Sequence, residues 1–239
     1  MRAFAPLLAF LISSTTALAE TPCGGEFTSF VKTLKSEAES RGFDAATVDG
    51  FFAPVRRDPA VLRADNAQGM FQRPFIEFSR QLISADRITR GKRNADRYDS
   101  TFDRVEQEFG VSRGVLLAFW AFETDFGAVQ GDFNTANALV TLAHDCRRPE
   151  LFRPQVFAAL ELYRQGQFDP ARTSGAWAGE IGMVQMLPGD IIENGVDGDG
   201  DERADLWRSE TDALTSAAHF LNRLGCAGRP LPSDVRRTG

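Results

Sequence analysis

Beyond its first 19 residues, the 239-residue sequence has no apolar stretch that approaches the roughly 20 residues of a transmembrane helix. It also has no internal repeat, no low-complexity tract and no convincing strand pattern. Positive charge is in deficit, with 27 Lys and Arg against 33 Asp and Glu and a formal net charge of -6. Because the basic residues are dispersed through an acidic chain, general nucleic-acid binding is not expected. We therefore expect no transmembrane segment and no nucleic-acid partner.

Cysteine is scarce as well, since three residues allow at most one disulfide and leave one free thiol. Three pairings are possible, and the sequence does not choose among them. We prefer Cys23–Cys146, which would join the N-terminal segment to the loop after the central helices and leave Cys226 free. The alternative is that all three are small buried residues without a partner, which an oxidising compartment makes less favourable.

The first 19 residues have the pattern of a secretory signal peptide. Arg2 precedes an apolar run, and Ala17-Leu18-Ala19 supplies the small residues of a cleavage site. Cys23 is not preceded by a lipoprotein-type tripeptide, so we expect a soluble, cleaved product. Cleavage would leave residues 20–239, enough for one domain with a substantial core.

The rest of the chain is a series of helical patterns, which indicates a single all-α domain. Asp44 is expected to cap a short helix that ends at Pro54, and Ser84 to cap one long polar helix that runs to Phe109. Further helices are predicted at 27–38, 71–83, 136–143, 149–165 and 211–224, with an irregular glycine-rich stretch at 166–182.

A helix predicted at 110–127, with Ser112 as its N-cap, carries the main catalytic candidate, Glu123. Apolar residues cover almost its whole circumference, so we expect it to be the buried central helix. Phe119 and Trp120 precede Glu123 by four and three residues and lie over the same face. Aromatic surroundings disfavour the charged form, raise the pKa and suit the carboxyl group to donating a proton near neutral pH. The alternative is an ordinary helix-end glutamate in solvent.

Four motifs follow one another in a recognisable order and spacing: GVSRGVLLAFWAFETDFGAVQG, NALVTLAHDCRRPELF, GAWAGEIGMVQMLP and VDGDGDERADLW. With the pattern that precedes them, they resemble the lytic murein transglycosylases of the MltB type, bacterial enzymes with a lysozyme-like helical catalytic core. The resemblance extends over nearly the whole chain, from Cys23 to about Gly225.

The resemblance implies cleavage of the β-1,4 bond between N-acetylmuramic acid and N-acetylglucosamine in peptidoglycan, with a 1,6-anhydromuramic acid product. The implied partners are peptidoglycan glycan strands, and the implied location is the periplasm. One carboxyl group suffices for this chemistry, because the C6 hydroxyl of the sugar replaces water as the nucleophile. Glu123 matches the family's acid, whereas Asp125 points elsewhere on a helix. Two alternatives stay open: a non-catalytic peptidoglycan-binding relative, and a muramidase-type hydrolase in which Glu180 directs water.

Other positions match the family one by one. Gln185 matches a glutamine that holds an N-acetyl or hydroxyl group of the substrate, and Arg147 and Arg148 match a basic pair thought to meet the carboxylates of the peptide stem. Phe126 and Trp177 are candidates to line the cleft or stack on a sugar, although core packing explains them equally well. For the arginines alone, a solvated charge pair is the alternative.

The acidic motif predicts an EF-hand-like loop with Asp197, Asp199, Asp201, Arg203 and Asp205 at its first, third, fifth, seventh and ninth positions. It lacks the turn glycine and the final bidentate carboxylate, which Glu210 or Asp212 would replace only if the loop were reshaped. The family has a comparable loop, which implies a structural calcium or sodium ion. The chemistry itself requires no cofactor. A solvated acidic turn is the alternative.

Family members usually continue well beyond the helix that ends near Gly225. Residues 226–239 are short, polar and proline-containing, so we expect a disordered or truncated tail in place of that extension.

Overall fold

The computed structural model describes residues 22–67 and 74–226. The predicted signal peptide at 1–19 lies outside the described residues, as does the predicted tail apart from Cys226. Within the described ranges, no helix is both long and apolar enough to cross a membrane.

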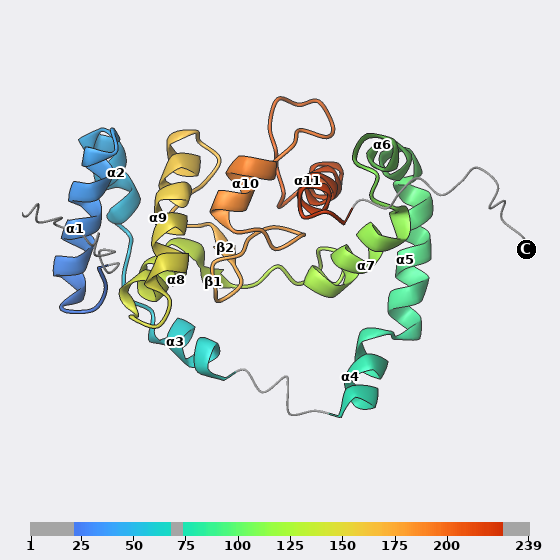
Figure 1. The fold of residues 1–239 in the computed structure, drawn as a ribbon, viewed down its shortest axis with the longest axis horizontal. Coiled ribbons are helices and arrows are strands. Elements are labelled where there is room, and N and C mark those ends of the chain that lie inside the picture. The colour runs from blue at the N-terminus through green and yellow to red at the C-terminus, as the bar shows by residue number, and fades with distance from the viewer. Residues whose placement is uncertain (1–21, 68–73, 227–239) are drawn as a thin grey trace, which may run out of the picture.

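The described chain is mostly helical, which confirms the all-α prediction. Its helices are α1 (Phe27–Ser40), α2 (Ala45–Phe52), α3 (Pro59–Asn66), α4 (Phe75–Leu82), α5 (Ala85–Arg97), α6 (Asp99–Phe109), α7 (Arg113–Thr124), α8 (Thr135–His144), α9 (Pro149–Arg164), α10 (Pro188–Asn194) and α11 (Glu210–Arg223). Two strands that the sequence did not predict, β1 (Phe133–Asn134) and β2 (Ser174–Gly175), form a small antiparallel pair. In Figure 1, α1 and α2 lie at one end, α5 and α6 at the other, and α8 to α11 between them.

The helices α2 and α3 begin at aspartate caps, of which Asp44 was predicted from the sequence and Asp58 was not. Asp44 accepts a hydrogen bond from the backbone N–H of Thr47 at 3.0 Å, and Asp58 accepts one from Ala60 at 2.8 Å. Each carboxylate satisfies a donor that the first helical turn leaves without a partner. The local sequence therefore fixes the starts of α2 and α3.

The long helix expected from Ser84 to Phe109 is instead two helices. Tyr98 interrupts it with φ -109° and ψ 28°, and ends α5 while it begins α6. Its ring packs edge-on against Trp120 of α7, with 5.7 Å between ring centroids. The prediction of one helix is wrong because packing of Tyr98 on α7 accompanies a change of direction that the sequence pattern does not mark.

The buried central helix is α8, not the segment at 110–127 as expected. Every residue of α8 from Thr135 to Ala143 is buried. Small residues let neighbouring elements approach it on all sides, and Asn137 and Thr141 accept hydrogen bonds from the backbone N–H groups of Arg56 and Asp58. α7 lies nearer the surface, where Val115 and Phe122 are exposed.

The N-terminal segment is tied to the end of α8. A disulfide joins Cys23 to Cys146, the pairing preferred from the sequence, and Cys226 is a free, exposed thiol. The backbone N–H of Gly24 donates to the carbonyl oxygen of His144 at 2.8 Å, and the His144 ring packs against Phe30 of α1. The disulfide closes a loop across 123 positions of sequence.

Candidate active site

Glu123 is the penultimate residue of α7, which ends because the three residues after Thr124 turn the chain. Asp125, Phe126 and Gly127 have φ values of 55°, 61° and 81°, all in the left-handed region. The helix thus stops three residues earlier than its predicted glycine stop. This turn leaves Glu123 in the last turn of α7 with its side chain accessible to solvent.

The turn is held by Asp125. Its carboxylate pairs with Arg90 at 2.6 Å and with Arg87 at 3.0 Å, both from α5. Hydrogen bonds from Arg90 hold the pKa of Asp125 below its usual range, and those from Arg87 add to this effect. Asp125 is therefore an ionised, paired carboxylate that faces α5.

Thr124 connects the end of α7 to the glycine-rich stretch. Its buried hydroxyl donates to the carbonyl oxygen of Met183 at 2.5 Å and accepts from the backbone N–H of Gly127 at 2.8 Å. The segment that carries Glu123 is thereby joined to the segment that carries Gln185. Nothing in the sequence distinguished Thr124 from an ordinary core threonine.

The electrostatic surroundings of Glu123 favour its protonated form. Surrounding protein atoms desolvate the carboxyl group and raise its pKa, and the negative charge of Glu180 raises it further. Trp120, expected beside Glu123, is buried between Tyr98 and Phe126, so the aromatic ring packs inward. The sequence predicted a raised pKa of Glu123 from aromatic neighbours and did not predict the contribution of Glu180.

Glu180 lies in the glycine-rich stretch opposite the end of α7. Its Oε2 atom is buried and has no hydrogen-bond partner among the described residues. Burial raises the pKa of Glu180, and the positive charge of Arg148 partly opposes this. An acid in these surroundings is more easily kept neutral than a free glutamate.

The glycine-rich stretch is a tightly packed loop. The backbone N–H of Ala176 donates to the carbonyl oxygen of Glu180 at 2.8 Å, and Ile181 and Met186 form a β-bridge. A Cβ atom on Gly179 would lie 2.3 Å from the Leu139 side chain, so a larger residue there would displace α8. Close packing on the central helix fixes this loop in place.

Gln185 is held in the same loop in a left-handed conformation, with φ 49°. Its amide nitrogen donates to the carbonyl oxygens of Gly182 at 2.9 Å and Gln130 at 3.2 Å. With both N–H groups engaged by backbone, the amide oxygen remains to accept from a ligand. Trp177, from the same loop, is half-buried and packs against the core.

Arg147 and Arg148 follow α8 and both contact one carboxylate, that of Asp65 on α3. Arg147 reaches Asp65 Oδ2 at 2.6 Å, and Arg148 pairs with Oδ1. The Asp65 side chain is only 2% exposed, whereas the two arginines are 44% and 42% exposed. No local sequence pattern singles out Asp65 beyond its place four residues after the buried Val61.

Phe126 lines two cavities on the side of α7 that faces α5. One, of about 170 Å³, is lined mainly by apolar residues of α5 and α7, including Phe122, and the other, of about 360 Å³, by arginines of α5 and by Asp125. The ring packs edge-on against Trp120 and lies 5.3 Å from the Arg90 guanidinium carbon. Phe126 thus both packs on the core and lines the surface between α5 and the end of α7.

The acidic loop brings four carboxylates together. Asp197, Asp199, Asp201 and Asp212 each offer an oxygen atom within 4.8 Å of the others. Asp205, expected as a ligand, is not among these four, and its Oδ1 accepts the backbone N–H of Trp207 at 3.1 Å.

Asp212, at the start of α11, supplies the fourth carboxylate. Its oxygens accept from the backbone N–H groups of Gly198 and Asp205, both at 2.8 Å. Hard cations such as Ca²⁺ prefer oxygen ligands, so a cluster of four carboxylates is chemically suited to bind one. The ligands and the ion both stay predictions, with Asp212 as an added candidate ligand.

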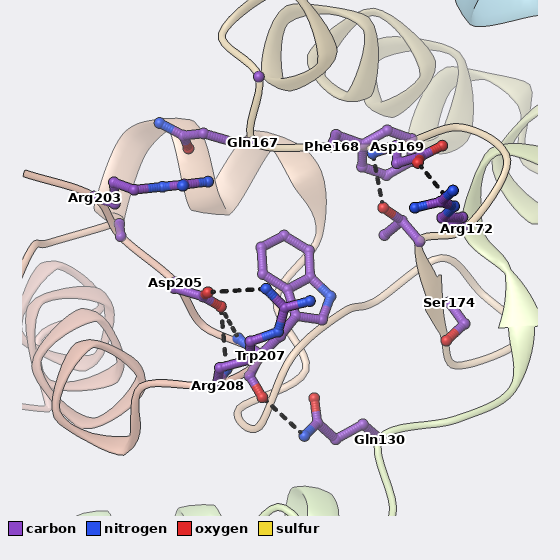
Figure 2. A pocket seen from close by; sticks show the side chains of 13 residues that line it. Gln130, Gln167, Phe168, Asp169, Arg172, Ser174, Arg203, Asp205, Trp207 and Arg208 are labelled. Carbon is purple, nitrogen blue, oxygen red and sulfur yellow. Dashed lines mark hydrogen bonds and ion pairs between the residues drawn. The ribbon is translucent and has the colours of Figure 1, made fainter.

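A cavity of about 530 Å³, whose lining does not include Glu123, is shown in Figure 2. Arg172, Arg203 and Arg208 line it together with the indole of Trp207. Gln130 borders the cavity and donates to the carbonyl oxygen of Trp207 at 3.2 Å. The backbone carbonyl oxygen of Gln130 also accepts a hydrogen bond from Gln185, so Gln130 lies between this cavity and the loop that carries Gln185.

A helical fold in which a glutamine-bearing loop is joined to a helix with a glutamate in its last turn is that of the lysozyme-like lytic transglycosylases. The chain belongs to the transglycosylase SLT domain family, whose model matches residues 26–236. It is 28% identical to membrane-bound lytic murein transglycosylase B of Escherichia coli (strain K12) over 194 residues, which is 77% of this chain and 54% of that protein.

Solved structures are similar over most of the chain. SltB3 from Pseudomonas aeruginosa, in complex with NAG-anhNAM-pentapeptide, matches with a TM-score of 0.79 and 32% identity over 88% of this chain and 58% of that one. The Escherichia coli lytic transglycosylase Slt35, in complex with calcium, matches with a TM-score of 0.76 and 26% identity over 86% and 66%. The chain thus spans little more than half the length of the first relatives that it matches.

Proposed function

We propose that this protein is a lytic transglycosylase that cleaves the β-1,4 bond between N-acetylmuramic acid and N-acetylglucosamine of peptidoglycan and forms a 1,6-anhydromuramic acid end. The observation that carries the proposal is the state of Glu123. Its carboxyl group is accessible, its pKa is raised, and its helix end is joined through Thr124 to the loop that carries Gln185. Family membership supplies the reaction class.

In the proposed reaction, Glu123 acts twice. Its carboxyl group first donates a proton to the glycosidic oxygen as the bond from C1 to that oxygen breaks. The resulting carboxylate then accepts the proton of the C6 hydroxyl as that oxygen bonds to C1. Glu123 thus regains the proton that it donated, and no water is consumed.

The neighbouring carboxyl groups favour this reaction over hydrolysis. A hydrolase needs a second, ionised carboxylate that either attacks C1 or activates water. Asp125 is paired with two arginines, and Glu180 has a buried, unpartnered oxygen and a pKa raised by burial. Asp125 is engaged by its arginines and Glu180 is partly buried, so neither carboxylate is free to attack C1 or to activate water, and the muramidase alternative is the weaker one.

Substrate contacts follow from the same geometry. We assign the free amide oxygen of Gln185 to an N–H or O–H group of the sugar, because its nitrogen is already engaged. The exposed sides of Arg147 and Arg148 are assigned to carboxylates of the peptide stem. Phe126 and Trp177 are half-buried, and their exposed edges are available to a sugar face.

We further propose that the acidic loop holds a structural Ca²⁺ or Na⁺ ion, with Asp197, Asp199, Asp201 and Asp212 as carboxylate ligands and the Arg203 carbonyl as a backbone ligand. Such an ion would link the loop to the start of α11. It has no part in the proton transfers. The proposed location is the periplasm, where the substrate is found and where a disulfide persists.

Digestion of purified peptidoglycan sacculi tests the reaction. Soluble fragments with 1,6-anhydro ends, identified by mass spectrometry, are the expected result. Fragments with reducing ends would establish a hydrolase instead. Binding to sacculi without release of fragments would establish the non-catalytic alternative.

A pair of matched variants tests the acid. Glu123→Gln is expected to lower kcat by about 100- to 10,000-fold, the usual contribution of general acid–base catalysis, while sacculus binding is retained. Glu108→Gln is the control, because Glu108 is also the exposed penultimate residue of a helix, α6. Near-normal turnover by Glu123→Gln, or an equal loss in the control, would contradict the assignment.

A further inference from the structure

The carboxylate of Asp65 lies behind the two arginines assigned to the peptide stem. It is almost inaccessible to solvent, at 2% side-chain exposure, and both guanidinium groups contact it. An acid buried in this way is normally found with a partner that neutralises it. Here one acid is shared by two half-exposed arginines, so each arginine has an inner side fixed by protein and an outer side open to solvent.

The two arginines are fixed to different extents. Arg147 also pairs with Asp145 at 2.9 Å and donates to the Asn66 side chain at 2.9 Å, so three acceptors hold its plane. Arg148 pairs with Asp65 alone within the described chain, and its guanidinium carbon lies 5.1 Å from the centre of the Phe152 ring. Asp65 is therefore the acid on which the orientation of Arg148 depends.

The position of Asp65 is itself rigid. α3 begins at the cap residue Asp58, whose backbone N–H donates to the hydroxyl of Thr141 on the buried helix α8 at 2.9 Å. Two turns later, Asp65 lies on the inward side of α3 together with the buried Val61. The acid is thus supported by the core and does not depend on a surface loop.

The charge of Arg148 is linked to the proposed acid through Glu180. Arg148 is close enough to Glu180 for its charge to act on that carboxyl group, and Glu180 in turn acts on Glu123. A ligand bound at Glu123 that carries carboxylates on its muramic acid unit would bring them near these guanidinium groups. Several N–H donors of Arg148 remain free for them, because its ion pair with Asp65 uses one nitrogen.

We propose that Asp65 is a positioning residue, which turns Arg147 and Arg148 toward the carboxylates of the peptide stem and so sets a preference for peptide-bearing glycan. The proposal rests on the proposed function, since it names the substrate feature that the same site selects. Asp65 does not touch the substrate. It acts by fixing the guanidinium planes before binding, which reduces the side-chain entropy lost when the ligand is bound.

The test compares wild type and Asp65→Asn on two substrates, glycan strands with peptide stems and strands from which an amidase has removed the stems. For peptide-bearing strands, kcat/KM is expected to fall about tenfold, mainly through KM, which corresponds to one weakened charge contact. For peptide-free strands, the change should stay within about twofold, since Glu123 and Gln185 are unaffected. Equal losses on both substrates, or no loss on either, would overturn the proposal.

A matched control uses Asp49→Asn. Asp49 forms an exposed ion pair with Lys35 at 2.7 Å, so its removal also breaks an Asp–cation contact, but between α1 and α2. This variant is expected to treat the two substrates as the wild type does. If Asp49→Asn also changed the preference for peptide-bearing over peptide-free strands, the effect of Asp65→Asn would come from the loss of one negative charge and not from the arginines.

Two further measurements separate positioning from structure and from catalysis. Arg148→Lys should produce the same loss, and adding Asp65→Asn to it should cost little more, because both changes act on one contact. Additive losses would indicate that Asp65 stabilises the fold independently.

Binding of a free acidic stem peptide, measured by calorimetry, should weaken in Asp65→Asn and persist in Glu123→Gln. It remains informative even if no cleavage is found. Tighter binding by Asp65→Asn would show that Asp65 competes with the ligand for the arginines, and would refute positioning.

Discussion

Replacement of Thr124 by valine tests how the proposed acid is held in place. Valine keeps the shape of the side chain and removes only the hydroxyl. In the structure, that hydroxyl makes two hydrogen bonds, to the Met183 carbonyl at 2.5 Å and from the Gly127 N–H at 2.8 Å. The first connects α7 to the glutamine loop, and the second stabilises the turn that follows Glu123.

The expected cost follows from these two contacts. Each buried hydrogen bond contributes about 1 kcal/mol, and the backbone groups left without partners add to the loss, for a total of about 2–3 kcal/mol in the free energy of unfolding. For a chain of this size, that corresponds to a Tm lower by about 4–12 °C. Because the helix end carries Glu123, kcat should also fall by about 10- to 100-fold, the effect of a small misplacement of a catalytic group.

Thr135→Val is a control of the same chemistry. Thr135 is also fully buried, but its hydroxyl has no hydrogen-bond partner within the described residues. Removing an unsatisfied buried hydroxyl should leave Tm unchanged or raise it by a few degrees, about 1 kcal/mol at most. Thermal unfolding followed by circular dichroism, with kcat measured on the same samples, checks both variants. Equal destabilisation by the two, or normal kcat in a destabilised Thr124→Val, would refute the reasoning.

Three other predictions concern charge, the acidic loop and the disulfide. Glu180→Gln removes a negative charge that raises the pKa of Glu123, so the alkaline limb of the pH profile of kcat should move to lower pH. An unchanged limb would show that Glu180 does not influence the pKa of Glu123. Chelation of divalent ions should lower Tm without changing kcat, and Asp212→Asn should remove the response of Tm to added calcium; an unchanged melting curve argues against an ion. Removing Cys23–Cys146, which closes a loop over 123 positions, should cost about 5 kcal/mol. A Tm within about 3 °C of the wild type would contradict that estimate.

Local signals in the sequence were enough to predict most helices. Caps such as Asp44 and Ser84 accept hydrogen bonds from the first turns of α2 and α5, as their residue types lead one to expect. The break at Tyr98 was not predictable in the same way. No glycine or proline marks it, and it accompanies the packing of the Tyr98 ring on Trp120, which is distant in sequence.

Hydrophobicity alone did not identify the central buried helix, because side-chain size also decides which helix is buried. The segment at 110–127 is more aromatic, and its apolar circumference favoured burial. α8 is the helix that is buried, because alanine and threonine let other helices approach closely and Asn137 and Thr141 find backbone donors. Large side chains such as Phe122 instead keep α7 at the surface, beside a cavity.

The candidate site was predictable in its motif residues and not in the residues that support them. Glu123, Gln185 and the two arginines stand in recognisable motifs. Asp65 lies more than 80 positions before the arginines that it holds, and no local pattern marks it. Its role is visible only when α3 is placed against the end of α8.

Backbone strain explains why the end of α7 was placed too late from the sequence. A glycine is the usual left-handed stop, and Gly127 was therefore expected to end the helix. Asp125 and Phe126 adopt left-handed φ values first, at a cost of about 1–2 kcal/mol each for residues with a Cβ atom. Two ion pairs to Asp125 and the edge-on packing of Phe126 on Trp120 offset that cost. The ion pairs come from α5 and the ring contact from α7 itself, so the early turn that leaves Glu123 accessible depends on both helices.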